Sequence, residues 1–181
     1  MRNSYENRHI KKFAKVSNCG NYRYELQRSW FSKDEFINPC VFIMLSPSSI
    51  DPLRDDRTVL RCMGFAKKFG YNQIKIVNLF ALCVKKSDYI YLSHDPIGKL
   101  NNLSIIDACE YTINPKKEKR LSGKIICAWG AAGPFQQRAN DVAELLSSYP
   151  LYCLGVTDKE KHPKHPLYLP NCTELQPYSP I

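Results

Sequence analysis

Four short apolar runs, separated by segments with helical periodicity, constrain the fold of this chain more than any other feature. The runs lie at residues 40–45, 74–80, 124–130 and 151–155. Each is short enough for a strand, and a continuous apolar run indicates a strand that is buried on both faces. The segments with helical spacing lie at residues 58–69, 100–112 and about 134–148. Strands that alternate with helices predict an α/β fold with a mainly parallel sheet.

The length of 181 residues allows one domain with its own core, whereas two full domains would be cramped. We therefore expect a basic N-terminal arm at residues 1–20 and a single α/β domain over residues 21–181. The expected architecture is a three-layer sandwich around a four-stranded, mainly parallel central sheet. Residues 22–28 alternate in polarity and predict a further strand at a sheet edge.

The charge balance points to a polyanionic partner. The chain has 26 basic and 17 acidic residues, a formal net charge of +9, and nucleic acid is a common partner for such a surface. No apolar run approaches the roughly 20 residues that span a bilayer, and the N-terminus has no apolar stretch of the kind that a secretory signal needs. We therefore expect a cytoplasmic protein with no membrane partner.

The eight cysteines include no C-x-x-C pair, which argues against a zinc ribbon. Most lie inside apolar runs, where cysteine behaves as a small buried hydrophobic residue. One alternative stays open, because Cys153, His162, His165 and Cys172 have the right side chains to surround a zinc ion.

Ligands of parallel α/β sheets bind outside the carboxyl ends of the strands. The residues that follow the predicted strands are Ser46-Pro47-Ser48, Asn78-Leu79-Phe80, Trp129-Gly130 and the late HPKHP segment. No glycine-rich phosphate loop and no G-x-S-x-G turn follows any of these strands. The sequence therefore argues against an NTPase, a dehydrogenase and an α/β-hydrolase.

Blocks spread over almost the full length resemble a family of bacterial and phage proteins filed as domain of unknown function 1643. They are RYELQRSW, FIMLSPSSID, DDRT, RCMGFAKKFGY, VNLFAL, HDPIG, AWG and HPLYLP. A more distant resemblance is to the uracil-DNA glycosylase superfamily. Four blocks occur in the order of that superfamily: Ser46-Pro47, the strand ending in Asn78, Trp129-Gly130, and His165-Pro166.

The glycosylase resemblance implies an enzyme that flips a base out of DNA and hydrolyses its N-glycosidic bond, with neither metal nor organic cofactor. It implies that His165 donates a hydrogen bond to the departing base and that Asn78 binds the Watson–Crick edge. Phe80 would stack on the base, and Pro47 and Ser48 would belong to the base-binding loop. The plainer alternatives are a loop histidine, an asparagine that satisfies loop backbone, and a core phenylalanine.

Two departures from the superfamily pattern carry information. Ser46 replaces the usual Asp, Asn or Glu that orients the attacking water, so we expect Asp51 to orient water or stabilise the sugar cation, together with Ser46. The alternative is that Asp51, which precedes Pro52, only initiates a turn. Ser48 replaces an aromatic residue that crowds the pyrimidine 5-position, so the pocket is expected to accept a larger, 5-substituted pyrimidine such as a modified base of phage DNA.

Basic residues flank the proposed leaving-group donor. Lys159, Lys161 and Lys164 flank His162 and His165 and are expected to hold DNA phosphates. A solvated surface turn is the alternative for any one such cluster.

The functional hypothesis is a monofunctional DNA glycosylase that acts as a monomer on double-stranded DNA. Three alternatives stay open. They are a non-catalytic DNA- or base-binding module of the same fold, an enzyme acting on a free nucleoside or nucleotide, and a Mg²⁺-dependent phosphoesterase built on Asp51, Asp55 and Asp56.

Overall fold

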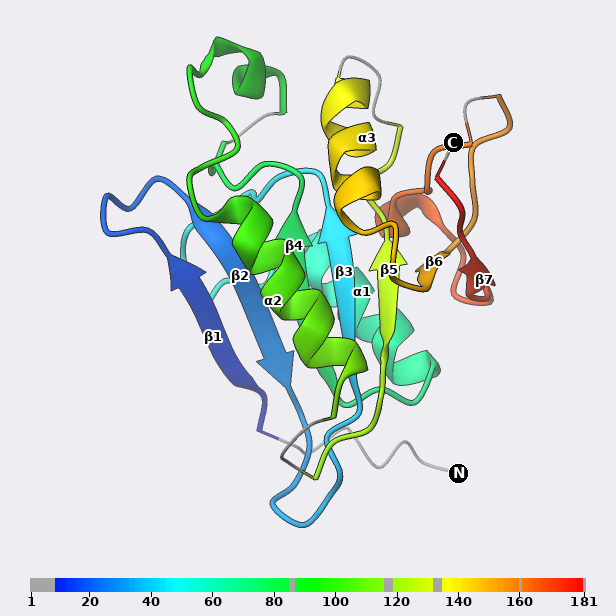
Figure 1. Ribbon diagram of the computed structural model, residues 1–181. Helices are drawn as coiled ribbons and strands as arrows, with labels where there is room; N and C mark the ends of the chain where they lie inside the picture. The colour runs from blue at the N-terminus through cyan, green and yellow to red at the C-terminus, as the bar shows by residue number, and fades with distance from the viewer. Residues whose placement is uncertain (1–8, 85–86, 116–118, 132–134, 160, 181) are drawn as a thin grey trace.

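A computed structural model describes residues 9–84, 87–115, 119–131, 135–159 and 161–180, which form a mixed sheet of seven strands with three α-helices (Figure 1). The strands are β1 (Lys11–Val16), β2 (Arg23–Ser29), β3 (Pro39–Met44), β4 (Gln73–Asn78), β5 (Lys124–Cys127), β6 (Leu151–Cys153) and β7 (Gln176–Pro177). The helices are α1 (Arg57–Lys68), α2 (Asn101–Ile113) and α3 (Gln136–Leu145), with short 3-10 helices η1 (Ser87–Leu92) and η3 (Pro166–Tyr168).

The sheet has the order β1-β2-β4-β3-β5-β6-β7. The four strands predicted from the apolar runs are β3, β4, β5 and β6, and they pair in parallel. The prediction of a four-stranded sheet is wrong, because β1, β2 and β7 extend it with antiparallel pairs. The small β7 comes from the proline-rich tail, whose sequence has no strand pattern.

The strand predicted at residues 22–28 is β2, and its predicted position at a sheet edge is also wrong, since β2 lies between β1 and β4. The three charged residues of β2 are all buried, and two of them form ion pairs. Glu25 pairs with Lys75 at 2.6 Å, and Arg28 pairs with Asp55 at 2.6 Å. The edge strand is β1, which occupies residues 11–16 of the expected basic arm, whereas residues 1–8 lie outside the described part of the chain.

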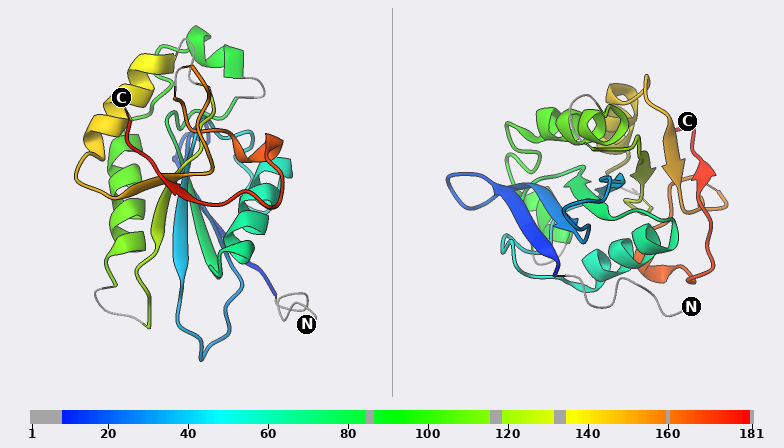
Figure 2. Two further views of the ribbon diagram at one scale, coloured as in Figure 1. Left: turned by 90° about the vertical axis from the view of Figure 1, so that its right-hand side faces the viewer. Right: turned by 90° about the horizontal axis from the view of Figure 1, so that it is seen from below.

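Helices cover both faces of the sheet, as the two views of Figure 2 show. Along β3, Val41 and Ile43 pack in one core with α2 and α3, whereas Cys40 and Phe42 pack in a second core with α1. This alternation follows from the two-residue period of a strand with both faces buried. All eight cysteines are free thiols, and five of them are buried, as the apolar runs predicted.

The helices begin and end within two or three residues of their predicted bounds. Asp56 caps α1 by accepting a hydrogen bond from the Val59 amide at 2.8 Å, and Gly70, with a φ of +80°, follows the helix. Pro134, expected in the first turn of the third helix, lies outside the described residues. No helix in the described ranges has the length and apolar character needed to cross a membrane.

Candidate functional site

A small cavity of about 80 Å³ lies at the carboxyl ends of β3 and β4, beside the first turn of α1. Its polar lining residues are Arg23, Ser46, Ser48, Asp56, Thr58, Asn78 and His165. The sheet therefore brings together four of the residues singled out by their positions after strands: Ser46, Ser48, Asn78 and His165. The other lining residues are apolar; three belong to β3, β4 and α1, and Leu45 directly follows β3.

Asn78, the last residue of β4, is only 1% exposed, yet neither its side-chain oxygen nor its side-chain nitrogen has a hydrogen-bond partner. Its backbone is held firmly. Asn101 of α2 donates to the carbonyl oxygens of Asn78 at 3.0 Å and Leu79 at 2.9 Å, and Arg138 of α3 donates to Leu79 at 2.8 Å. A buried amide without partners is rare in native proteins and requires an explanation.

His165 reaches the cavity from the segment before η3. Its Nδ1 accepts a hydrogen bond from the Leu167 amide at 3.2 Å, which assigns the proton of the neutral ring to Nε2. Burial lowers the pKa of His165, and the negative charge of Asp56 only partly opposes this effect. The ring is therefore a neutral Nε2–H donor at neutral pH.

Hydrogen bonds from Gly130 and Arg61 hold the His-Pro segment in place. The Gly130 amide donates to Pro163 at 2.9 Å, and a Cβ on Gly130, whose φ is +83°, would lie 3.4 Å from the Cβ of His165. From α1, Arg61 donates to the carbonyl oxygen of Pro166 at 3.2 Å and also to that of Leu169. The Trp-Gly and His-Pro blocks, which are far apart in sequence, are thus in direct contact.

The carboxylate at the cavity is Asp56 and not Asp51. Asp51 is exposed and accepts a hydrogen bond from the Leu53 amide at 2.8 Å, the turn-forming role that was the alternative at the sequence level. Asp56 accepts from the Val59 amide with one oxygen and from the Ser48 hydroxyl with the other. Asp55 is engaged elsewhere, by Arg28 and by Lys12.

The described residues form neither of the two predicted metal sites. In the described part of the chain, no three His, Cys, Asp or Glu side chains are placed to hold a metal ion. Cys153 is buried near Gln176, whereas Cys172 is exposed in the tail that Lys68 binds through backbone carbonyl oxygens.

Other predicted residues lie away from the cavity lining. Phe80 packs in the core that α2 and α3 cover, on the other face of the sheet from α1, and lies edge-on to Phe135 with 5.1 Å between ring centroids. Pro47 is buried beside the lining residues Ser46 and Ser48. The three lysines do not line the cavity: Lys159 and Lys161 are exposed and Lys164 is half-buried.

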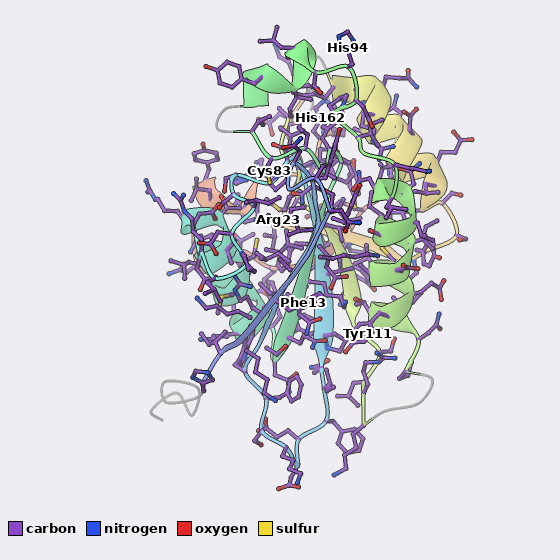
Figure 3. The ribbon with its side chains drawn as sticks, turned by 90° about the vertical axis from the view of Figure 1, so that its left-hand side faces the viewer. Phe13, Arg23, Cys83, His94, Tyr111 and His162 are labelled. Atoms are coloured by element: carbon purple, nitrogen blue, oxygen red, sulfur yellow. The ribbon has the colours of Figure 1, made fainter. Side chains whose placement is uncertain are left out.

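Arg23 was not anticipated. It is 4% exposed and lines the cavity, Nη1 donates to the carbonyl oxygen of Ser49 at 2.7 Å, and Nε has no partner. Figure 3 shows Arg23 and Cys83 at the upper end of the sheet. Burial lowers the pKa of Arg23, and it raises that of the nearby Cys83 thiol.

A bulge explains why strand alternation does not predict the position of Arg23. In the β1–β2 pair, Lys15 faces Glu25 while Val16 faces Arg23, so Tyr24 is an extra residue. Glu25 lies on the α2 side with Lys75, whose amine lies above the Tyr111 ring. The bulge turns Arg23 to the opposite face, toward the cavity.

These features define a mixed α/β protein with a compact polar site at the ends of its parallel strands. The chain belongs to the family described as Protein of unknown function (DUF1643), whose model matches residues 23–167. The match includes every polar residue of the cavity lining. No curated protein and no solved structure matches the chain.

Proposed function

We propose that this protein is a DNA glycosylase-like enzyme whose cavity receives a flipped base and hydrolyses its N-glycosidic bond. The observation that carries the proposal is Asn78, whose side-chain donor and acceptor are both unpaired in a cavity that His165 also lines. The Watson–Crick edge of a base presents matching acceptors and donors, so a flipped base would satisfy this amide. The order of the four glycosylase-like blocks along the chain supports the same reaction class.

Four polar residues of the cavity have roles in this reaction. Asn78 hydrogen-bonds the base edge, and His165 donates to a base oxygen as negative charge develops there. Ser46 and Asp56 orient a water toward the sugar, so that Asp56 takes the role expected of Asp51. The bond between C1′ and the base nitrogen breaks with its electron pair on the base, the water oxygen bonds to C1′, and the proton lost by water ends on the base.

The size of the cavity supports a flipped base over a whole nucleotide. Ligand pockets for complete small molecules usually enclose about 300–1,000 Å³, whereas this cavity encloses about 80 Å³. Ser48, a small side chain at the rim, supports a 5-substituted pyrimidine as the base. The net charge of +9, with Lys159, Lys161 and Lys164 beyond His165, supports duplex DNA as the partner of a monomeric enzyme.

A non-catalytic base-binding module is the second candidate. It is favoured by Ser46, which is no base at neutral pH, and by Asp56, both of whose oxygens already accept protein hydrogen bonds. Such a module would bind the flipped base through Asn78 and leave the glycosidic bond intact.

The test is an incubation with plain, uracil-containing and 5-substituted pyrimidine duplexes in EDTA, followed by alkali to reveal abasic sites. We expect cleavage that survives EDTA, is lost in Asn78→Ala and His165→Ala, and falls in Asp56→Asn. Asp51→Asn is the matched control and should keep the wild-type rate. Salt-sensitive binding without abasic sites would establish the binding module, and cleavage that needs a divalent cation would refute the metal-free reaction.

A further inference from the structure

Arg23 is a buried cation with no direct ion pair, and the Asp56 carboxylate of the same cavity attracts it only from beyond ion-pair distance. No carboxylate among the described residues lies within ion-pair distance of it, and its Nε is unpaired. Arg28, on the same strand, is fully buried but pairs with Asp55 at 2.6 Å and also donates to the carbonyl oxygens of Gln27 and Pro52. Arg28 is therefore structural, whereas the charge of Arg23 has no structural use of this kind.

Burying a charge without a partner costs several kcal/mol. Such a cost is retained where the charge serves a ligand, because a bound negative group would offset it. The Ser49 carbonyl oxygen accepts from Nη1 of the guanidinium, Nε has no partner, and the side chain lines the cavity. The structure thus points to a ligand that carries negative charge at some stage of its binding or reaction.

The neighbouring groups decide which kind of anion fits. A phosphate offers only acceptors, so it would leave the Asn78 side-chain oxygen unpaired, and it would face the Asp56 carboxylate. A pyrimidine ring offers both donors and acceptors at its edge, and as an anion it spreads one negative charge over ring nitrogens and carbonyl oxygens. The cavity therefore suits a base anion better than a phosphate.

We propose that Arg23 binds the nucleobase in this cavity and stabilises the negative charge that the base acquires as it leaves the sugar. This inference rests on the proposed glycosylase function and adds a catalytic residue to it. When the C1′–N bond breaks, the electron pair stays on the base, and a neutral His165 can donate a hydrogen bond but supplies no positive charge. Arg23 supplies that charge in a site sheltered from water, where electrostatic stabilisation is strongest.

The test uses free bases, so it does not depend on turnover. 5-Nitrouracil has an acidic ring N–H and absorbs differently as an anion, so the full-length protein is titrated with it at several pH values, with uracil as the neutral comparison. Wild type should bind the anion about tenfold more tightly than the neutral base, which corresponds to lowering the bound ligand's pKa by about one unit. Arg23→Gln should lose this preference yet bind the neutral base, which shows that the variant is folded.

Arg57→Gln is the control, because it removes the same charge from an exposed side chain next to Asp56. It should keep the wild-type preference for the anion. Binding of neutral and anionic bases with no preference in wild type, or a preference that survives in Arg23→Gln, would overturn the role of Arg23 alone. Absence of base binding together with absence of abasic sites would overturn the proposed function with it. Saturable binding of inorganic phosphate that displaces the base would assign the site to a phosphate.

Discussion

Replacing Asn78 with leucine should make the folded protein more stable while it destroys the site. In the free protein this side chain is 1% exposed and both polar atoms lack partners, so its amide contributes desolvation cost without a compensating hydrogen bond. Leucine has a similar size and carries no polar atoms. The change therefore separates the requirements of folding from those of ligand binding.

The size of the gain follows from the two unpaired atoms. An unsatisfied buried polar group costs about 1–3 kcal/mol, and the amide of Asn78 counts as one such group. We expect Asn78→Leu to raise the free energy of unfolding by about 2 kcal/mol. For a chain of this length that corresponds to a melting temperature about 4–8 °C higher, measured by calorimetry and by urea unfolding, while base binding is lost.

Asn101→Leu is the matched control. Asn101 is likewise a buried asparagine whose side-chain oxygen lacks a partner, but its nitrogen donates to two carbonyl oxygens at the end of β4. Its replacement should lower stability by about 2 kcal/mol, because those carbonyls lose their donors. The reasoning is refuted if both variants lose stability to the same extent, since Asn78 would then be a structural residue whose amide is satisfied in solution.

Three further predictions concern the parts of the fold that support the site. Arg28→Met should destabilise the protein by about 3 kcal/mol in chemical unfolding, because the partly buried Asp55 keeps only Lys12 as a partner and the carbonyl oxygens of Gln27 and Pro52 lose their donor. Burial alone would raise the pKa of Asp55, but hydrogen bonds from Lys12 and Arg28 outweigh it and lower the pKa. The stability that Asp55 contributes is therefore fully present above its unfolded pKa of about 4. It is lost as the pH falls through the lower pKa of the folded state. Unfolding measured over a series of acid pH values should show this loss in wild type and not in Asp55→Asn. Arg61→Ala should release η3 from α1, speed amide hydrogen exchange at Leu167 and reduce excision, while exchange in the central strands stays unchanged.

The central strands could be predicted because a strand that is buried on both faces has a continuous apolar sequence, as β3 to β6 do. The helices could be predicted because their apolar residues recur at a spacing of three and four. The edges of the sheet could not be predicted, since β1 is polar and β7 has only two paired residues. Paired charges inside β2 have the same appearance in sequence as solvated ones.

The candidate site could be predicted in part for a geometric reason. Ser46, Ser48, Asn78 and His165 meet because strand ends and the segments that follow them converge at one end of a parallel sheet. Arg23 depends on a bulge that no periodicity reveals. The choice of Asp56 over its neighbour depends on where α1 begins, and three nearby aspartates are equivalent until the loop conformation is known.

The lysines of β1 have a consequence for self-association. Lys11, Lys12 and Lys15 lie on the outermost described strand, and part of their charge is used within the molecule, since Lys12 pairs with Asp55 at 2.5 Å and Lys11 lies above the Phe31 ring. A strand at the edge of a sheet can pair with an edge of another molecule, and lysine side chains discourage such pairing. The charge that first suggested a nucleic-acid partner would thus also disfavour pairing of this edge with the sheet of another copy.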